Sequence, residues 1–429
     1  MQSKPIQEQV AIILGASGRI GRERAQRSAE RSAGRLDLLS LLLSDVRYGL
    51  GAYLGVYLMT EHGWNAESIG FALSFGGLTG LVVQGPLCAL VDRIRAKREL
   101  LAASVVVVTA TCLVIPLAPR FWPVAACGVV GALAGTMVSP LLAAISLGIT
   151  GPLRFAQRAC QNEGLFHLGN GLVNVLILLS APIFGTPVLF WAMGLTALAS
   201  VAAALAVPED AIDHAVARGL LPGTVAVPPA ATALRLVAAS RPLLLFALCG
   251  ALFHLANGSM LGLVAQKLAL AHPGQGIALT AASAIAAQSV MVPAAALAGW
   301  RADAWGRKPL LMVAFAALAV RGMLYAAVSD PAWIIAGQLL DGVAAGLLGA
   351  LFPVVIADLT QGSGCFAGVQ GVIGTVHGLG GVASGAMSGW IVGQAGYDAA
   401  FLMLGLAAAS GGLLFWLALP ETAGHDGAI

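Results

Sequence analysis

Long uninterrupted apolar runs are the feature that most limits what this chain can fold into. A helix needs about 20 consecutive apolar residues to cross a bilayer, and runs of that length recur along the 429 residues. Lipid offers the backbone no hydrogen-bond partner, so runs this long must be helical. Only 10% of the residues are charged, against about 25% in soluble domains, which excludes a water-soluble globule.

Twelve such runs are found, in two groups of six. The first group covers 36–59, 67–90, 99–118, 122–148, 162–183 and 186–207. The second group covers 242–270, 276–299, 309–328, 332–357, 367–393 and 398–419. The sequence therefore predicts an all-α polytopic membrane protein, with 12 transmembrane helices arranged as two six-helix bundles.

The basic residues predict how the chain is oriented in the membrane. Of the 23 Lys and Arg, 19 fall in segments on the side of the N-terminus, whereas the loops on the other side hold only Arg120. Basic loops stay in the cytoplasm, so both termini are expected there. Arg outnumbers Lys 19 to 4, which is typical of a GC-rich bacterial source and therefore of residence in the cytoplasmic (inner) membrane.

The predicted parts follow from these runs and charges. They are a basic cytoplasmic N-terminal tail at 1–35, an N-terminal six-helix bundle at 36–207, a cytoplasmic linker at 208–241, a C-terminal six-helix bundle at 242–419 and a cytoplasmic tail at 420–429.

Similar residues recur at one offset in the two groups. Asp92 and Asp303 lie 211 residues apart, and His167 and His377 lie 210 apart. The near-constant offset indicates duplication of a six-span unit. Parallel six-span repeats are a transporter architecture.

The loops at the two aspartates carry a family signature. The second loop contains Gly299, Asp303, Gly306, Arg307 and Lys308. This spacing resembles the Gly-x3-Asp-x2-Gly-Arg-Lys/Arg signature of the major facilitator superfamily. The first loop keeps the aspartate and the basic run but has Cys88 and Arg95 where glycines are expected. The resemblance implies secondary transport by alternating access, with a central cavity between the bundles.

Charges in these loops are candidates for a cytoplasmic gate. A loop aspartate can cap a neighbouring helix N-terminus, while Arg and Lys bridge to acidic groups. The gate residues we expect, with the complete second copy first, are Gly299, Asp303, Gly306, Arg307 and Lys308, followed by Asp92 and Arg93. The alternative is that these charges only set the orientation in the membrane.

The chain resembles drug-exporter-like members of that superfamily but lacks two antiporter motifs. No Arg stands in the comparable stretch of span 4, between Ala126 and Gly131. Span 5 has His167-Leu168-Gly169-Asn170-Gly171 in place of a Gly-x3-Gly-Pro pattern. These differences count against proton-coupled drug antiport.

Ionisable groups at membrane depth are the candidates for the cavity, because burying them is costly. Asp45 and Arg47 in span 1 are about 200° apart around the helix, so only one of them can face a cavity. The resemblance implies that spans 1 and 7 line it, and the repeat offset leads from Asp45 to His254 and Asn257. The predicted cavity residues are Asp45, Arg47, His167, Asn170, His254, Asn257 and His377.

Other roles remain open for these residues. Asp45 and Arg47 can instead form a structural pair that holds span 1 to its neighbours, and a lone His in a helix is more often a packing residue. Asp45 and His254 are the candidates to carry a coupling proton. Arg321 and Asp341 reach similar depth in spans joined by a short turn, which predicts a structural ion pair.

The function predicted from the sequence is secondary active transport of a small organic solute, coupled to protons, with export preferred. Alternatives are an importer or uniporter of a nutrient or metal chelate and, in another class, a membrane enzyme or sensor without transport. No catalytic residues, cofactor or bound metal are expected, since the six cysteines form no CxxC pair. The expected partners are the solute, H+ and the lipid bilayer, without nucleic acid, and the chain is expected to act as a monomer.

Overall fold

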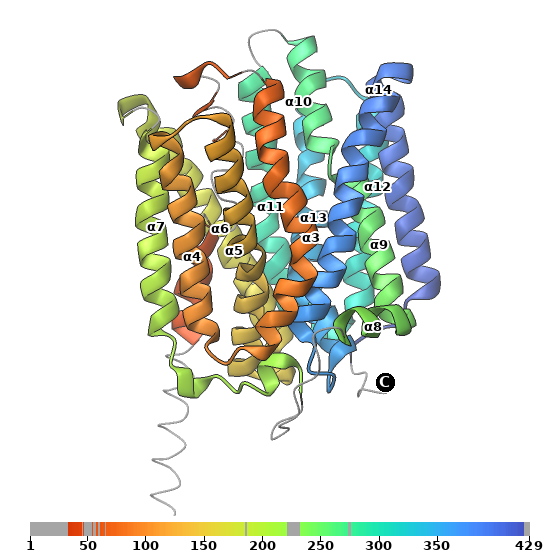
Figure 1. Cartoon of the computed structure of the whole chain (residues 1–429). Coiled ribbons are helices and arrows are strands. Elements are labelled where there is room, and N and C mark those ends of the chain that lie inside the picture. The colour runs from red at the N-terminus through yellow and green to blue at the C-terminus, as the bar shows by residue number, and fades with distance from the viewer. Residues whose placement is uncertain are drawn as a thin grey trace, which may run out of the picture.

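The computed structural model describes residues 33–44, 66–184, 187–220, 232–272 and 276–423, together with a few positions between 46 and 64. In this part of the chain every regular element is a helix (Figure 1). Eight helical segments among these residues are long and apolar enough to cross a membrane.

The N-terminal half runs up to residue 206 and begins with a helical segment at 33–44. Its labelled helices are α3 (Ala66–Arg93), α4 (Lys97–Val114), η1 (Ile115–Leu117), α5 (Phe121–Thr150), α6 (Pro152–Phe184) and α7 (Pro187–Ala206). A single residue, Gly151, joins α5 to α6, and its φ of 70° is a conformation that glycine adopts at little steric cost.

One predicted boundary is wrong by about ten residues. The apolar run that predicts span 5 starts at 162, whereas α6 starts at Pro152. The added turns contain Arg158, which is buried and paired with Asp37. A hydropathy window ends at charged residues such as Arg158. It cannot detect that a partner in another helix compensates the charge.

The C-terminal half starts at residue 241. Its helices are α9 (Arg241–Asn257), α10 (Met260–Ala271), α11 (Gly276–Trp305), α12 (Arg307–Ala327), α13 (Pro331–Thr360) and α14 (Phe366–Ala418). In α14 two spans are merged across a break at Gly396, whose φ is 84°. Asp330 caps α13 by accepting a hydrogen bond from the N–H of Ala332 (2.8 Å).

The connection between the halves lies across one end of the bundle, which we call the linker side. It contains η2 (Glu209–Ala211), η3 (Val216–Arg218) and α8 (Thr232–Ala239), the last seen at the bottom of Figure 1. The N–H of Asp213 donates to the carbonyl of Gly148 at the end of α5 (3.1 Å), and the N–H of Gly362 donates to the carbonyl of Gly219 (2.5 Å). This part of the connection is therefore bonded to both halves.

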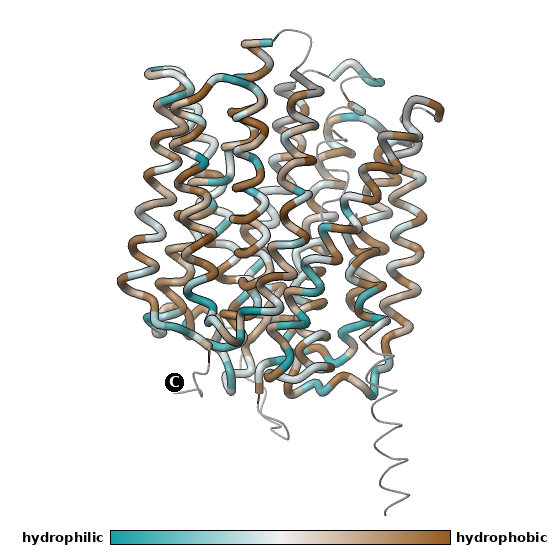
Figure 2. The backbone as a smooth tube through the Cα atoms, turned by 180° about the vertical axis from the view of Figure 1, so that it is seen from behind, coloured by the Kyte–Doolittle hydropathy of each residue, from teal (hydrophilic) through white to brown (hydrophobic). Residues whose placement is uncertain are grey.

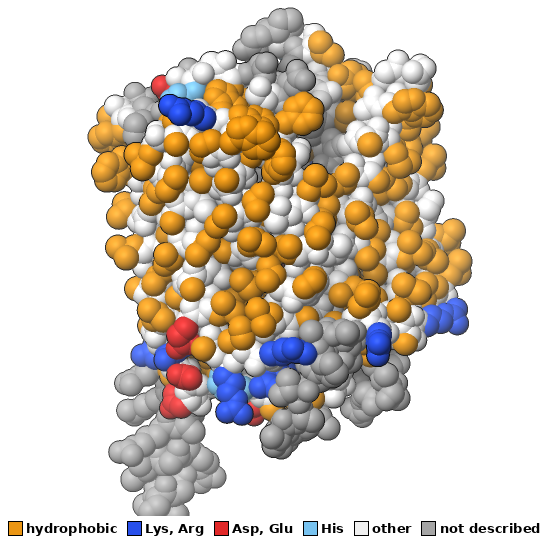
Figure 3. Space-filling view, in the orientation of Figure 1, with side chains coloured by type: hydrophobic (Ala, Val, Ile, Leu, Met, Phe, Trp, Pro, Cys, Tyr) orange, Lys and Arg blue, Asp and Glu red, His pale blue; other side chains and the backbone are white. Residues whose placement is uncertain are grey.

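The surface is that of a protein embedded in lipid. Hydrophobic side chains cover the middle of the molecule, and Lys and Arg gather mostly at the lower edge of the view, where the linker side lies (Figure 3). In the backbone view coloured by hydropathy, hydrophobic (brown) and intermediate (pale) residues make up most of the helices (Figure 2). Large side chains such as Leu179 and Trp416 are more than half exposed, so their outer faces require an apolar environment.

Within each half, neighbouring helices pack closely. In the N-terminal half α5 packs against α3 and α4, and in the C-terminal half α14 packs against α9 and α12, while α13 packs against α11 and α12. Two sets of contacts join the halves: α3 lies against α14, and α6 lies against α11 and α13. The repeat makes α3 equivalent to α11 and α6 equivalent to the first span of α14, so both interfaces follow one internal symmetry.

Glycines allow the closest of these approaches. A Cβ atom added to Gly322 in α12 would lie 2.5 Å from the Cα of Gly405 in α14. A Cβ added to Gly76 in α3 would lie 2.9 Å from the carbonyl oxygen of Gly128 in α5. Without a hydrophobic driving force between helices in lipid, close packing of this kind is a main source of their association.

We predict that Gly322→Ala lowers the thermal stability of the purified protein, because α12 and α14 must separate to admit the methyl group. Overpacking of this kind costs about 1–3 kcal/mol. The control is Gly389→Ala in α14, where an added Cβ meets nothing within 4 Å. Equal unfolding temperatures for the two variants would contradict the role given to this crossing.

Candidate functional site

A cavity of about 320 Å³ lies between the two halves. Its walls come from α3, α5 and α6 of the N-terminal half and from α13 and α14 of the C-terminal half, with Leu43 from the first helical segment. The polar residues lining it are Gln84, Thr136, Ser139, Asn162, Glu163 and Gln370. Among the described lining residues Glu163 alone is ionisable.

The cavity is set deep in the bundle. Glu163 follows the start of α6 by eleven residues, or about 16 Å along a helix that rises 1.5 Å per residue. Pro140 of α5 also lines the cavity and has no N–H to give to the carbonyl of Thr136. That carbonyl instead accepts a contact from the Sγ of Cys88 in α3 (3.7 Å).

A buried polar network fixes the helix that carries Glu163. The Oδ1 of Asn162 accepts from the hydroxyl of Ser40 (2.9 Å) and from the guanidinium of Arg158, while its Nδ2 donates to the Oγ of Ser146 (2.8 Å). Arg158 also pairs with Asp37 (2.6 Å). These bonds join the first helical segment, α5 and α6, so the network holds α6 in a fixed rotation within its own half.

His167 lies one turn beyond Glu163 and bridges the halves. It is 4% exposed. Its Nδ1 lies 3.1 Å from the Oε1 of Gln288 in α11, and its Nε2 lies 3.5 Å from the Oε1 of Glu163. Asn170, also predicted for the cavity, is half-buried in α6 and is not among the residues that line the cavity.

His254 and His377 contact each other instead of the predicted cluster. Their ring centroids lie 5.0 Å apart between α9 and α14. Phe352, which lines the cavity, packs against His377 at 5.2 Å. The two imidazoles therefore lie behind one wall of the cavity, within the C-terminal half.

Asn257 belongs to a different network. Arg321, which is fully buried, donates from Nη1 to the Oδ1 of Asn257 (2.6 Å) and to the Oδ1 of Asp341 (2.8 Å). Its Nη2 donates to the Oε1 of Gln338 (2.8 Å). The structure thus brings Arg321 and Asp341 together, and it joins Asn257 to that pair. Asp45 and Arg47, the other members of the predicted cluster, lie outside the described residues.

Asp92 joins the two halves on the linker side. Its carboxylate accepts from the N–H of Ala367 (2.9 Å) and of Gly368 (2.7 Å), at the N-terminus of α14. The free N–H groups and the dipole of a helix N-terminus favour a carboxylate there. Close by, Phe155 of α6 packs edge-to-face on Phe366 of α14 at 5.6 Å. Both contacts join the two halves.

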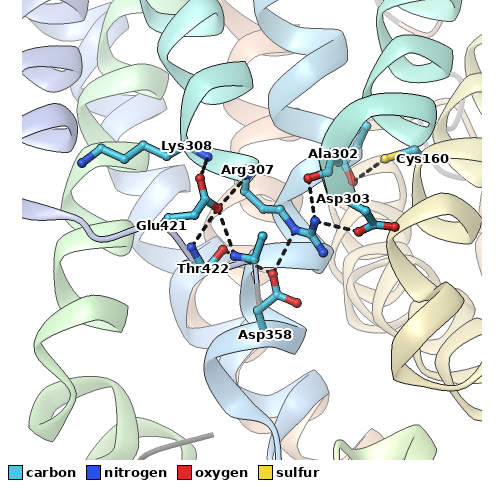
Figure 4. A network of polar contacts seen from close by, with 10 residues as sticks. Cys160, Ala302, Asp303, Arg307, Lys308, Asp358, Glu421 and Thr422 are labelled. Atoms are coloured by element: carbon cyan, nitrogen blue, oxygen red, sulfur yellow. Dashed lines mark hydrogen bonds and ion pairs between the residues drawn. The ribbon is translucent and has the colours of Figure 1, made fainter. Parts of the chain in front are cut away.

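The charged side chains of the complete second copy are bonded within their own half (Figure 4). Arg307 is paired with Asp303 (2.7 Å) and with Asp358 of α13 (3.1 Å). The Nζ of Lys308 donates to the carbonyls of Trp416 and Leu419 (2.7 Å each). In this structure the degenerate first copy supplies a carboxylate that crosses between the halves, whereas Asp303 and Arg307 pair within the C-terminal half. Arg93, next to that carboxylate, is exposed.

The first copy has Cys88 where the signature has a glycine, and the glycine at this contact is Gly371 on the facing helix α14. In the second copy, a Cβ on Gly299 of α11 would lie 3.0 Å from the Cβ of Cys160 in α6. In the first copy, a Cβ on Gly371 of α14 would lie 2.5 Å from the Cβ of Cys88 in α3. Each interface between the halves thus pairs one glycine with one cysteine, in exchanged positions.

Glu421 caps the helix that follows the second loop. Its carboxylate accepts from the N–H of Arg307 (2.8 Å) and of Lys308 (3.0 Å), next to Gly306, whose φ is 87°. Burial acts to raise the pKa of Glu421, but backbone N–H donors, including those of Thr422 and Ala423, outweigh it and leave the pKa lowered. The carboxylate is therefore ionised at neutral pH and holds the start of α12.

Sequence reasoning missed the groups that line the cavity. The cavity residues predicted from the sequence include none of Gln84, Glu163 and Gln370, which line the cavity. The four-residue spacing of Glu163 and His167 was the available signal, since residues so spaced lie on one helix face. The glutamines belong to other helices, and their meeting depends on how the halves pack.

Comparison with known proteins agrees with this architecture. The family model described as Major Facilitator Superfamily matches residues 36–261 and 255–428. The chain belongs to the Major Facilitator Superfamily. An uncharacterized MFS-type transporter of Mycobacterium tuberculosis is 44% identical over 396 residues, which cover 92% of this chain and 95% of that protein. As a member of this family the chain is a multi-pass membrane transporter and not an enzyme.

Solved structures of the superfamily share the fold. The proton:xylose symporter XylE, bound to 6-bromo-6-deoxy-D-glucose, superposes with a TM-score of 0.67 at 14% identity, covering 93% of this chain and 97% of that one. The human organic anion transporter MFSD10 (TETRAN) superposes with a TM-score of 0.64 at 17% identity, covering 91% and 99%. As a superfamily member, this chain therefore has two six-helix bundles around a central cavity.

We predict that Asp92→Ala loosens the linker side of this transporter. Hydrogen bonds to charged groups contribute about 1.5–3 kcal/mol each, and 1.4 kcal/mol is a tenfold change in an equilibrium. Amide hydrogen exchange at residues 366–371 should therefore rise by about tenfold or more. Asp303→Ala is the matched control and should leave that exchange unchanged, so a similar rise in both variants would contradict the assignment.

We also predict that Arg321→Met destabilises the protein strongly, because Asp341 is left buried and unpaired. Breaking a buried pair from one side costs about 3–5 kcal/mol. The double variant Arg321→Met with Asp341→Leu removes both charges and should recover part of that loss. Chemical unfolding in detergent measures the difference, and a double variant no more stable than the single one would argue against a pair whose main role is structural.

Proposed function

We propose that this chain is a secondary active transporter that carries a small organic solute across a bacterial cytoplasmic membrane by alternating access. The observation that carries the proposal is the cavity between the halves, which are joined on the linker side by Asp92 and the N-terminus of α14. A solute held there contacts both halves, so a change in how the halves pack can expose it to the other side of the membrane.

The linker side is proposed to face the cytoplasm. Basic side chains gather there, as the positive-inside rule requires (Figure 3). Both termini, 1–35 and 420–429, are then cytoplasmic, 36–207 and 242–419 form the two bundles, and 208–241 is the cytoplasmic linker. In this orientation the described structure is closed toward the cytoplasm.

The lining of the cavity favours an uncharged or positively charged solute. Six polar groups offer hydrogen bonds, and the wall carries the carboxyl group of Glu163 without a Lys or Arg among the described lining residues. An anionic solute would be buried beside the carboxyl group of Glu163, which is costly. The XylE and MFSD10 structures share only the fold with this chain, so their substrates carry no weight here.

Coupling to protons and export are the proposed energy source and direction. Glu163 lines the cavity and His167 lies against it, so a titratable pair is available where the solute would bind. One chain encloses the whole cavity, which supports a monomer as the transporting unit. Import or uniport of a nutrient or metal chelate would use the same architecture and is an outcome that the transport assay distinguishes.

A thermal-shift screen of the purified full chain tests the solute class. Neutral, cationic and anionic small molecules are compared at two pH values, because a ligand present at 100 times its Kd stabilises the folded state by about 2.7 kcal/mol. Uptake of each stabilising compound into proteoliposomes, with and without a pH gradient, then gives coupling and direction. Stabilisation by anions alone would contradict the solute class proposed here.

We predict that Ser139→Trp abolishes transport of any compound so identified, because the indole fills the cavity. Ser289→Trp, at an exposed position of α11, is the matched control and should transport normally. Both variants are expected to fold, which their unfolding temperatures and gel-filtration profiles check. Normal uptake by the Ser139 variant would show that the solute passes elsewhere.

A further inference from the structure

A second groove lies between the halves, separate from the central cavity. It has a volume of about 430 Å³, and its described lining residues all belong to two helices, α6 and α11. Two packed helices alone leave a groove open along its length, toward the surroundings of the bundle. None of these lining residues also lines the central cavity. The groove is therefore a different site from the one proposed for the solute.

The groove has the length and the lining of a site for one acyl chain. Along α6 it extends from Gln157 to Leu168, which is eleven residues or about 16 Å. That is about half of the hydrocarbon core of a bilayer, or one leaflet. The polar Gln157 and Gln161 lie at the linker-side end, whereas Gly164, Leu168 and Ala296 line the deeper part. Leu168 and Ala296 are exposed, so in a membrane the deeper part of the groove meets acyl chains.

The linker-side end of the groove carries an arginine held between two tryptophans. The guanidinium carbon of Arg301 lies 3.7 Å from the ring centroid of Trp300, which lines the groove, and 5.0 Å from that of Trp305. Both indoles are more than half exposed, and tryptophans at the end of a membrane helix lie at the level of the lipid headgroups. The two rings therefore hold a cation at that level.

Arg301 has no anionic partner of its own. Its Nε is buried without an acceptor, and no hydrogen bond or ion pair joins its side chain to any described residue. A guanidinium held by stacking alone keeps its N–H donors available, and its planar fork matches a phosphate group in two hydrogen bonds. Arg154 precedes Gln157 by three residues, so it lies on the same face of α6, one turn nearer the headgroups, and it is exposed.

The acidic groups near this end of the groove are bound to other arginines. Asp303 of α11 is paired with Arg307 (2.7 Å). Asp37 of the first helical segment, which also contacts this part of α6, is paired with Arg158 (2.6 Å). Neither carboxylate is bonded to Arg301, so the cation between the tryptophans is available to an anion from outside the chain.

We propose that this groove binds one anionic phospholipid of the surrounding membrane, with an acyl chain between α6 and α11 and the phosphate group on Arg301. A lipid is favoured over a free phosphate ion because the cation adjoins a groove that is open to hydrocarbon. Basic sites between transmembrane helices are typical binding sites for anionic lipid headgroups. The inference does not rest on the proposed function, since it concerns only what the folded chain binds.

A lipid in this groove contacts both halves of the molecule. α6 belongs to the N-terminal half and α11 to the C-terminal half, and a Cβ added to Gly299 would lie 3.0 Å from the Cβ of Cys160. Both of these residues line the groove. Any movement of α6 relative to α11 changes the shape of the groove, so lipid affinity and the packing of the halves must influence each other reciprocally.

Native mass spectrometry of the full chain in detergent tests the phosphate site. Phosphatidylglycerol and phosphatidylcholine with the same acyl chains are titrated separately, and phosphatidylglycerol should bind more tightly. Arg301→Gln should weaken its binding about fivefold, the effect of one basic residue beside an anionic lipid, and leave phosphatidylcholine unchanged. The matched control is Arg241→Gln, which removes an exposed arginine at the linker-side end of α9 and should leave both affinities unchanged.

A second pair of variants tests the acyl chain. Ala296→Phe places a ring in the groove and should weaken the binding of both lipids. Leu297→Phe adds a ring at the neighbouring exposed position, which does not line the groove, and should bind both lipids normally. Both changes are at exposed positions, so both variants are expected to fold, which their unfolding temperatures check.

Each result supports or overturns the proposed lipid site. Equal binding of the two lipids by the wild-type protein, or equal losses in Arg301→Gln and Arg241→Gln, would overturn it. Displacement of phosphatidylglycerol by inorganic phosphate would assign Arg301 to a soluble anion instead. If Arg301→Gln fails to fold, the comparison of Ala296→Phe with Leu297→Phe decides, and equal lipid binding by these two variants would reject the groove.

Discussion

The packing of two helices of one half against three of the other is the interaction on which the site depends. α3 lies on α14, and α6 lies on α11 and α13, so the cavity exists only while these contacts close it. Both interfaces are built the same way, from a glycine on one helix and a cysteine on the other: Gly299 with Cys160, and Cys88 with Gly371. Glycine at these contacts lets the helices approach closely, and Phe155 on Phe366 adds an aromatic contact between the halves.

Polar contacts give the two ends of this interface different strengths. On the linker side a buried carboxylate, Asp92, is bonded to two backbone N–H groups of α14, and the bonded connection around Gly219 lies beneath it. Deeper in the bundle, His167 of α6 contacts Gln288 of α11 across the interface (3.1 Å). A ligand or proton that alters the deeper contacts has to overcome the hydrogen bonds that join the halves on the linker side. A change of a few kcal/mol is enough to shift such an equilibrium.

The sequence predicts the class of fold well and the site poorly, and the reasons are physical. Hydropathy and the positive-inside pattern are properties of each helix and loop separately, so they can be read from the sequence. The all-α fold with 12 spans that they predict is confirmed as the fold of a superfamily member. The start of α6 was missed because Arg158 is compensated by Asp37 across a distance that no window covers. The repeat offset pointed to His254 and Asn257 together; in the structure His254 contacts His377, whereas Asn257 accepts a hydrogen bond from Arg321. His167 and Gln288 come together only through the packing of α6 on α11, which no local pattern encodes.

The two neighbouring residues Asn162 and Glu163 show why a carboxylate can remain at the cavity wall. Successive residues in a helix point about 100° apart, so Asn162 faces its own half while Glu163 faces the other. The hydrogen bonds of the Asn162 side chain to Ser40, Ser146 and Arg158 stay within the N-terminal half. Those bonds hold α6 in one rotation, in which Glu163 lines the cavity and lies beside Gly349 of α13. A helix fixed from its own half can therefore present a carboxyl group to the other half, with the Nε2 of His167 3.5 Å from its Oε1.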